Sequence, residues 1–239
     1  PLVRADRRGK AAAAHRGGRG ASQAAATRAQ PSSTDVKSPA RSKTNAQWSE
    51  LTQAALLRAA REAFATRGYE DASLEAIAAA ASVTKGSIYH HYRDKRGLFR
   101  AVFEDVQRGI VARIDQVVTS SPTYLEGIVR GCEAFLKIVV TEGVARIVLT
   151  DAPSVLGWTV WRAIDNEIGG RSLRTGIEAA MRAGEIAPID AGALTTLING
   201  ALNETALTIV ESRDPEQTRR VAVATIRRVL ENLHRTAME

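Results

Sequence analysis

Six polar side chains fall between residues 84 and 91. They are Thr84, Lys85, Ser87, Tyr89, His90 and His91. Hydroxyl, ammonium and imidazole groups of this kind bind phosphate oxygens and the edges of bases. Gly86 lies among them and removes a side chain where a helix would approach a base edge. The chemistry that this cluster indicates is contact with a nucleic acid.

Residue types that catalysis needs do not gather elsewhere. Of the four histidines, His15 and His234 lie near the ends of the chain and the other two belong to the polar cluster. Cys132 is the single cysteine, so it has no disulfide partner within the chain and no companions for a zinc site. No phosphate-binding loop, dinucleotide fingerprint or His-Glu-x-x-His motif is present. The sequence therefore predicts no enzyme, no metal and no cofactor.

The elements that must position the cluster are helical. Apolar residues recur every three to four positions, and no segment keeps the two-residue alternation of a half-buried strand. Order is expected to begin at Trp48, and Gly68 is expected to end the first helix. Caps and breaks predict an all-α fold of about nine helices. The expected helices span residues 50–67, 74–81, 84–92, 94–119, 124–140, 144–149, 158–183, 191–212 and 215–233.

The second and third of these helices are separated by a tight turn, which is typical of a helix-turn-helix unit. In such a unit the second helix braces the third, which enters a major groove about 12 Å wide. The third helix should then be polar on one face and apolar on the other. Val83, Ile88 and Tyr92 supply the apolar anchor.

Charge is distributed unevenly along a chain whose formal net charge is +7. Residues 1–46 hold ten basic and two acidic side chains, residues 47–100 hold eight and six, and residues 101–239 hold 15 and 18. Residues 1–46 also hold almost no apolar side chains larger than alanine, and Pro31 and Pro39 interrupt them, so a disordered basic tail is expected. The tail either adds salt-sensitive affinity for DNA or is simply solvated, and the sequence leaves both interpretations open.

The sequence also bears on location. No run approaches the roughly 18 apolar residues that a membrane span needs, so no membrane partner is expected. The basic tail lacks the continuous apolar core of a secretory signal. A single cysteine fits a reducing compartment, and a cytoplasmic protein is predicted.

A recognisable set of residues lies within residues 50–103. It comprises Phe64, Gly68 and Tyr69, then Ser73, Leu74, Ile77, Ala78 and Ala81, then Val83 to Tyr89 without a gap, and finally Lys95, Leu98 and Phe99. In order and spacing this stretch resembles the DNA-binding domain of the TetR family of bacterial transcriptional regulators.

The stretch departs from the family pattern at two positions. Ser82 stands in the turn where the family usually has glycine, and a positive φ there would cost about 1 kcal/mol relative to glycine. Tyr92 closes the third helix where phenylalanine is common, and its hydroxyl is expected to reach solvent or phosphate.

The resemblance implies which residues contact DNA. Base-edge contacts are implied for Lys85, Gly86 and Tyr89, and Thr84 belongs to the same surface. Phosphate contacts are implied for Ser73, Ser87, His90, His91 and Lys95. Simpler interpretations remain open: the two histidines could form a solvated helix face, and Tyr89 and Tyr92 could be packing residues. Arg93 and Arg96 are either surface charges or phosphate ligands.

Three parts are expected: the tail (1–46), a helix-turn-helix domain (47–100) and a third domain (101–239). The resemblance implies that this third domain is helical, binds a small-molecule effector and forms a homodimer. An effector pocket should be mainly apolar with a few polar groups. The expected pocket residues are Phe135, Val139, Leu149, Trp158, Trp161, Arg162, Asp165, Met181 and Asn203. The two tryptophans could instead be core or dimer residues, and Arg162 could pair with an anionic ligand or with Asp165.

The last two helices are expected to form the dimer interface, because members of the family pair through them. The expected residues are Leu194, Leu197, Ile198, Ala201, Leu202, Ile209, Val221, Thr225 and Val229, some of which could equally be core. A two-fold dimer reads a palindrome. The resemblance therefore predicts a homodimeric regulator, by family habit a repressor, that binds a palindromic double-stranded operator and is released by a small molecule.

Overall fold

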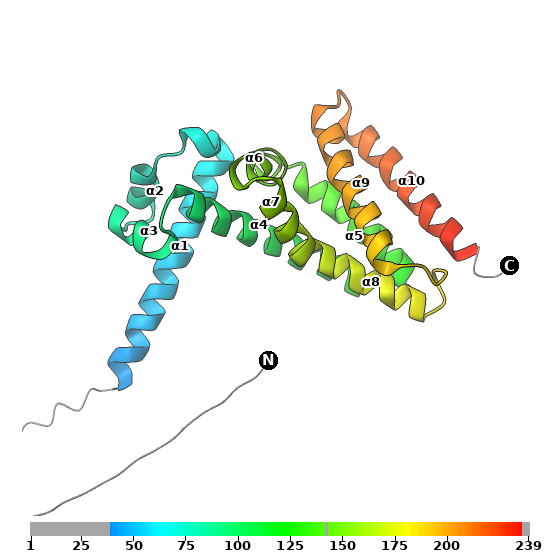
Figure 1. The fold of residues 1–239 in the computed structure, drawn as a ribbon, viewed down its shortest axis with the longest axis horizontal. Helices are drawn as coiled ribbons and strands as arrows, with labels where there is room; N and C mark the ends of the chain where they lie inside the picture. Colours follow the sequence, from blue (N-terminus) through cyan, green and yellow to red (C-terminus); the bar gives the residue numbers. More distant parts are fainter. Residues whose placement is uncertain (1–38, 142, 236–239) are drawn as a thin grey trace, which may run out of the picture.

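The computed structural model describes residues 39–141 and 143–235, and helices make up most of them (Figure 1). Within this part of the chain there are α-helices, two π-helical segments (η1 and η2) and no strand. Each π-helical segment runs directly into an α-helix, which leaves nine continuous helical segments in the described residues. The predicted all-α fold with about nine helices is confirmed.

The N-terminal lobe contains α1 (Pro39–Asp71), α2 (Leu74–Ala80), α3 (Lys85–Tyr92) and the start of α4 (Lys95–Thr119). Its core is aromatic: the ring of Phe64 meets that of Phe99 edge-on, with centroids 5.1 Å apart, and the ring of Tyr69 completes the group. Ile88 of α3 is fully buried against this core. These contacts fix α3 on the body of the lobe.

Three polar side chains begin the helices of this lobe. Ser73, Thr84 and Asp94 have extended backbones, and each side-chain oxygen accepts a hydrogen bond from the backbone N–H three residues later. These bonds satisfy N–H groups that have no partner within a helix. Local sequence therefore determines where α2, α3 and α4 begin, as predicted.

Helix α1 differs from the prediction at its start. It begins at Pro39, whereas residues up to 46 were assigned to a disordered tail with Pro39 as a helix breaker. Proline is tolerated in the first turn of a helix, because the N–H that it lacks would have no partner there. At Gly68 the backbone is not helical, with φ 81° and ψ 171°, so the first regular helix ends at the predicted glycine and a short helical stretch follows it to Asp71. The rest of the predicted tail, residues 1–38, lies outside the described residues.

The C-terminal lobe begins with α5 (Tyr124–Val139) and ends with two long helices, α9 (Ala191–Glu211) and α10 (Pro215–Arg235), which lie side by side. Between them the chain forms η1, α6, α7, η2 and α8. These elements span Arg146–Asp151, Ala152–Leu156, Trp158–Asp165, Asn166–Gly170 and Arg171–Arg182. Helix α4 runs from the first lobe into the second and packs along α5 (Figure 1).

Two groups of polar contacts join the lobes. Arg96, near the start of α4, donates to the carbonyl oxygens of Val155 and Leu156 at the end of α6. Asp151 accepts a hydrogen bond of 2.9 Å from the backbone N–H of Tyr69, beside the kink in α1. Arg146 donates to carbonyl oxygens of α1. The η1–α6 segment is thus tied to both α1 and α4.

Among the described residues, no helix combines the length and the apolar character that crossing a membrane requires.

Candidate nucleic-acid interface and ligand cavity

Helix α3 presents a polar outer face and an apolar inner face. Ile88 is fully buried, whereas the neighbouring Tyr89 has 46 % of its surface exposed. Thr84, Lys85, Gly86, His90 and His91 are exposed as well. Ser87 is half-buried, with its hydroxyl hydrogen-bonded to that of Thr84. The structure therefore leaves the predicted polar cluster exposed or half-buried around α3, with Ile88 as the buried residue of the helix.

The turn before α3 has the positive φ that favours glycine, although a serine stands there. Ser82 has φ 56°, in the left-handed region, and the N–H of Val83 closes the turn on the carbonyl of Ala78. A side chain in this region is strained relative to glycine. The geometry of a glycine turn is thus kept with a serine in place.

Lys85 is held by an acidic neighbour on the bracing helix. Its ammonium group is paired with the carboxylate of Glu75 in α2 and lies 5.8 Å from the centroid of the Tyr89 ring. The hydrogen bond from Lys85 lowers the pKa of Glu75 to about 2 and raises the pKa of Lys85. Both side chains are largely exposed, so the pair is accessible to a competing anion.

Other predicted phosphate ligands have contacts within the chain. Ser73 caps α2 and donates to Glu75, and the Lys95 ammonium donates to the carbonyl of Glu70 and lies 4.7 Å from the Tyr69 ring centroid. The guanidinium of Arg96 is directed to α6, as described above. The hydroxyl of Tyr92 is buried, which corrects the expectation that it reaches solvent or phosphate. The reason is that this helix end packs on the lobe's core.

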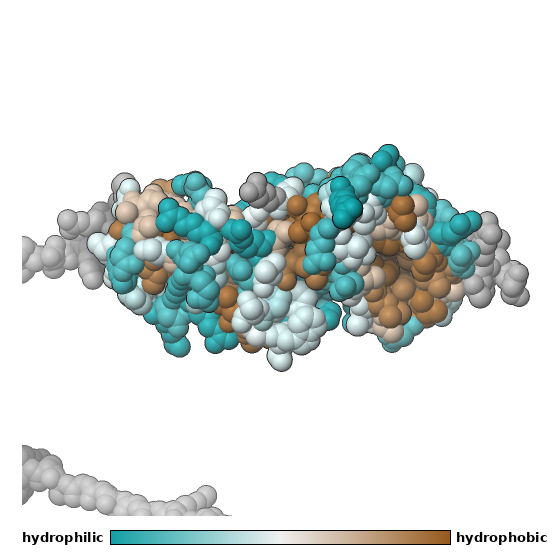
Figure 2. All heavy atoms as spheres, turned by 90° about the horizontal axis from the view of Figure 1, so that it is seen from above, coloured by the Kyte–Doolittle hydropathy of each residue, from teal (hydrophilic) through white to brown (hydrophobic). Residues whose placement is uncertain are grey.

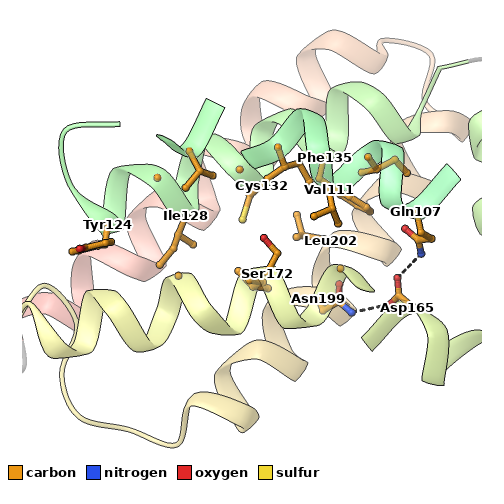
Figure 3. A pocket seen from close by; sticks show the side chains of 18 residues that line it. Gln107, Val111, Tyr124, Ile128, Cys132, Phe135, Asp165, Ser172, Asn199 and Leu202 are labelled. Atoms are coloured by element: carbon orange, nitrogen blue, oxygen red, sulfur yellow. Dashed lines mark hydrogen bonds between the residues drawn. The ribbon is translucent and has the colours of Figure 1, made fainter. Parts of the chain in front are cut away.

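The C-terminal lobe encloses a cavity of about 100 Å³ between α4, α5, α8 and α9 (Figure 3). Apolar side chains and glycines form most of its wall. The lining residues are Gln107, Ile110, Val111, Ile114, Val118, Tyr124, Gly127, Ile128, Gly131, Cys132, Phe135, Asp165, Gly169, Ser172, Leu173, Gly176, Asn199 and Leu202. Burial raises the pKa of the Cys132 thiol to about 12, so this thiol is uncharged at neutral pH.

One end of the cavity is polar. Asp165 is 3 % exposed, and its carboxylate accepts hydrogen bonds from Gln107 at 3.0 Å, Asn199 at 2.8 Å and Asn203 at 3.2 Å. Gln107 belongs to α4, Asp165 to α7 and the two asparagines to α9. The exposed Tyr124 lies at the opposite end (Figure 3). The cavity is therefore apolar along its length and acidic at one end.

Two of the nine predicted pocket residues, Phe135 and Asp165, line this cavity. The other seven do not, and Asn203 reaches it only through Asp165. Val139 and Leu149 are buried in the core, and Met181 packs against it. Helical spacing identifies these positions as apolar, but it does not tell a cavity wall from a filled core.

The two predicted tryptophans lie in different environments, and neither lines the cavity. Trp161 is buried and donates through Nε1 to the carbonyl of Val148, whereas Trp158 is 59 % exposed. The guanidinium of Arg162 lies over both rings, 4.8 Å from that of Trp158 and 5.5 Å from that of Trp161. Arg162 is therefore stacked on the tryptophans, and no ion pair with Asp165 occurs in the described part of the chain.

The predicted dimer residues divide into two faces of α9 and α10. Leu194, Leu202 and Ile209 are buried in the chain's own core, so they offer no surface to a second copy. Ile198 is half-buried. The exposed members are Leu197, Ala201, Val221, Thr225 and Val229. Apolar surface gathers at the end of the molecule that holds these helices (Figure 2).

Most residues of the cavity wall were not predicted from the sequence. A Cβ on Gly127, Gly131 or Gly176 would lie 3.3 to 3.5 Å from a side chain of α4 or α5, so these glycines allow the helices to approach closely. Asn199 lies one turn before the predicted Asn203 on the same face of α9. The buried polar residues Gln107 and Asn199 carried a usable signal, because a polar side chain on the apolar face of a helix needs a buried partner.

Comparison with known proteins gives the same assignment for both lobes. Residues 56–102 match the model for bacterial regulatory proteins of the tetR family. Residues 125–233 match the model for a tetracyclin repressor-like C-terminal domain. The two matches together cover the helix-turn-helix unit and the lobe that encloses the cavity.

Individual relatives extend over different lengths. A TetR-family transcriptional regulator from Pectobacterium atrosepticum is 34 % identical, with a TM-score of 0.66, over 78 % of this chain and 96 % of that one. The Transposon Tn10 TetC protein of Escherichia coli is 25 % identical over 62 % of this chain and 75 % of its own length. The regulator UidR of E. coli is 33 % identical, but the match covers only 28 % of this chain and 34 % of UidR. RolR, solved with resorcinol, shares the fold at 19 % identity and a TM-score of 0.63.

A helix-turn-helix lobe joined by one long helix to a helical lobe defines a DNA-binding transcriptional regulator. The chain belongs to the TetR family. Proteins of this family regulate transcription and are not enzymes, and AcnR of Corynebacterium glutamicum, 36 % identical over 66 residues, is a transcriptional repressor. The predicted family and class are thus confirmed.

Proposed function

We propose that this regulator is a homodimeric repressor that binds a palindromic operator and leaves it when a small molecule enters the cavity. The observation that carries the DNA-binding part is the contrast on α3 between the buried Ile88 and the exposed Tyr89. A helix anchored by one face and free on the other can lie in a major groove.

Within α3, Lys85 and Tyr89 are the proposed base-edge contacts, and Gly86 allows the helix to approach closely. Lysine donates to guanine O6 or N7, and an aromatic side chain can contact a thymine methyl group. Ser73, Thr84, Ser87, His90, His91 and Lys95 are the proposed phosphate contacts. Lys95 stands at the first position of α4, where free backbone N–H groups also attract an anion.

The homodimer is proposed to form through the exposed residues of α9 and α10. Leu197 is 70 % exposed, and Val221 and Val229 are exposed as well. Large apolar side chains gathered in this way are typical of an interaction surface. A two-fold pair would carry the two α3 helices together, which suits half-sites about 34–36 Å apart.

The effector is proposed to bind in the cavity between α4, α5, α8 and α9. RolR holds resorcinol within the same fold, which supports a ligand role for this lobe. A ligand that favours the conformer with poorly spaced α3 helices lowers operator affinity by that preference. Helix α4 belongs to both lobes, so it is the proposed connection between ligand and operator.

The test is selection of bound DNA from a random pool with the full chain, followed by binding measurements on the selected site. Tyr89→Ala should lower specific affinity by about 1–3 kcal/mol without changing the mass of the assembly in solution. Leu51→Ala, which removes an exposed apolar side chain on α1, is the control. Unchanged specific affinity in Tyr89→Ala would overturn the assignment of α3, and a selected site without two-fold symmetry would overturn the dimeric operator.

A further inference from the structure

The acidic end of the cavity holds a buried carboxyl group. Each oxygen of Asp165 accepts a hydrogen bond from a neutral amide. Among the described residues no basic side chain forms an ion pair with it, since Arg162 is stacked on the two tryptophans. A buried charge of this kind is costly unless it is paired.

The hydrogen-bond donors at this end are all neutral. Gln107, Asn199 and Asn203 each donate an N–H to Asp165, and Asn203 does so from behind the cavity wall. The polar end therefore lacks a positively charged partner. Its negative charge disfavours carboxylates and phosphates, although the apolar wall would accept their hydrocarbon parts.

Size limits what can occupy the cavity. Its volume is about 100 Å³, somewhat less than the roughly 150 Å³ engineered cavity that binds benzene. Phe135, Ile128 and Leu202 supply apolar contacts along the wall. One small ring or a short hydrocarbon chain fits this space.

From these observations we propose that the effector is a small apolar molecule with one protonated amine, whose ammonium group pairs with Asp165. This inference rests on the proposed effector role of the cavity. An ammonium group supplies several N–H donors and the missing positive charge, and such charge-assisted hydrogen bonds are about twice as strong as neutral ones.

The same contact suggests how ligand binding is transmitted to the DNA-binding lobe. Gln107 ties α4 to α7 through its 3.0 Å hydrogen bond to Asp165. An ammonium group competes with Gln107 for the same carboxylate, so its binding weakens the tie at the centre of α4. Arg96 anchors the start of α4 to α6, directly before α7. A shift between α4 and α7 is thereby passed to the helix-turn-helix unit.

Three matched probes separate the ligand chemistries. Butylamine, 1-butanol and butyrate share a four-carbon skeleton and differ in carrying a positive charge, a neutral hydroxyl and a negative charge. Binding to the full chain is measured by calorimetry at neutral pH. The amine should bind at least about tenfold more tightly than the alcohol, and butyrate should bind least. Equal or tighter binding of the alcohol or of butyrate overturns the proposal.

Two variants locate the binding. Asp165→Asn should remove the preference for the amine over the alcohol. The control is Asp105→Asn, which removes an exposed carboxylate of α4 two residues before Gln107 and should keep the preference. Because Asp165→Asn could unfold the lobe, Ile128→Trp provides a second test. It fills the cavity, leaves Asp165 in place and should abolish binding of the amine. An amine that still binds Ile128→Trp would show that the site lies elsewhere.

Operator binding is measured separately in the same samples. If the amine binds with the stated preference but does not release DNA, the ligand class stands and the proposed effector release fails. If the chain binds its selected DNA but shows no preference for the amine, the ligand class fails while the DNA-binding function stands.

Discussion

The ammonium group of Lys85 in α3 is paired with the carboxylate of Glu75 in α2. One partner belongs to the helix that faces DNA and the other to the helix that braces it. The pair keeps Lys85 near the Tyr89 ring, 5.8 Å from its centroid, and also places a negative charge beside the proposed DNA surface. Glu75 therefore orients Lys85 and at the same time competes with DNA for it.

Replacing Glu75 by Gln should raise DNA affinity. The substitution frees Lys85 from its partner and removes a charge that repels phosphates. We expect severalfold tighter binding at low salt, with the larger gain on non-specific DNA, because electrostatic contacts dominate there. Fluorescence anisotropy with the selected site and with a scrambled duplex measures both affinities.

The control for this experiment is Glu104→Gln, which removes a paired carboxylate from α4. It should leave DNA affinity within twofold of the wild type, a margin of about 0.4 kcal/mol. The pH dependence of folding stability gives a second check, on the ion pair itself. Because the pKa of Glu75 is lowered to about 2, the pair contributes stability above the ordinary carboxyl pKa of 4.5 and loses it as the pH falls toward 2. Equal DNA binding by Glu75→Gln and the wild type would refute the competition.

Ser82→Gly should stabilise the protein. Ser82 has φ 56°, so glycine relieves strain of about 1 kcal/mol, part of which is offset by the greater freedom of glycine in the unfolded chain. Urea unfolding should show a gain of a few tenths of a kcal/mol up to about 1. The neighbouring Ala81 has φ −84°, and Ala81→Gly should lose stability instead. A loss in both variants would mean that the serine side chain stabilises the turn.

Substitution by alanine should have opposite effects at two glycines of α4. A Cβ on Gly97 would lie 2.1 Å from the carbonyl oxygen of Tyr92, whereas one on Gly109 would meet nothing within 4 Å. Gly97→Ala should therefore destabilise the fold by about 1–3 kcal/mol or more, as overpacking does. Gly109→Ala should stabilise it by up to about 1 kcal/mol through helix propensity. Thermal unfolding of the two variants decides, and similar midpoints would contradict the close contact at Gly97.

Local features of this fold were predictable from sequence. Thr84 and Asp94 begin their helices through hydrogen bonds that span three residues, so nearby sequence is sufficient. The alternation of the buried Ile88 with the exposed Tyr89 follows from helical period alone. The family resemblance adds which exposed residues face DNA, and that assignment stays a prediction.

The cavity was harder to predict because it depends on which helices meet. Leu197 and Leu202 are both apolar residues of α9, yet one is exposed and the other lines the cavity. Their spacing does not say which face meets the core and which meets solvent. The wall also needs Gly131 of α5 opposite Ile114 of α4, a match between distant segments that no local pattern reveals. Asp165 was predictable only as a charge on a helix otherwise rich in apolar residues.

Arg93 and Arg96 differ in their contacts, although the sequence left open whether either of them binds phosphate. Arg96 donates 3.0 and 2.9 Å hydrogen bonds to the carbonyls of Val155 and Leu156, whereas Arg93 is exposed at the end of α3. Arg96→Gln should lower the free energy of unfolding by about 1 kcal/mol or more, since hydrogen bonds to a charged group are lost. It should also speed hydrogen exchange in η1 and α6, which Arg96 holds against α4.

Salt dependence of DNA binding separates the two arginines. Each phosphate contact adds about 0.9 to the slope of log affinity against log salt. Arg93→Gln should reduce the slope by about that amount and leave stability within about 0.5 kcal/mol of the wild type. Arg96→Gln should leave the slope unchanged, because its guanidinium is already occupied by α6. A reduced slope in Arg96→Gln would show that DNA draws this side chain away from α6, and the contact between the lobes would then itself respond to operator binding.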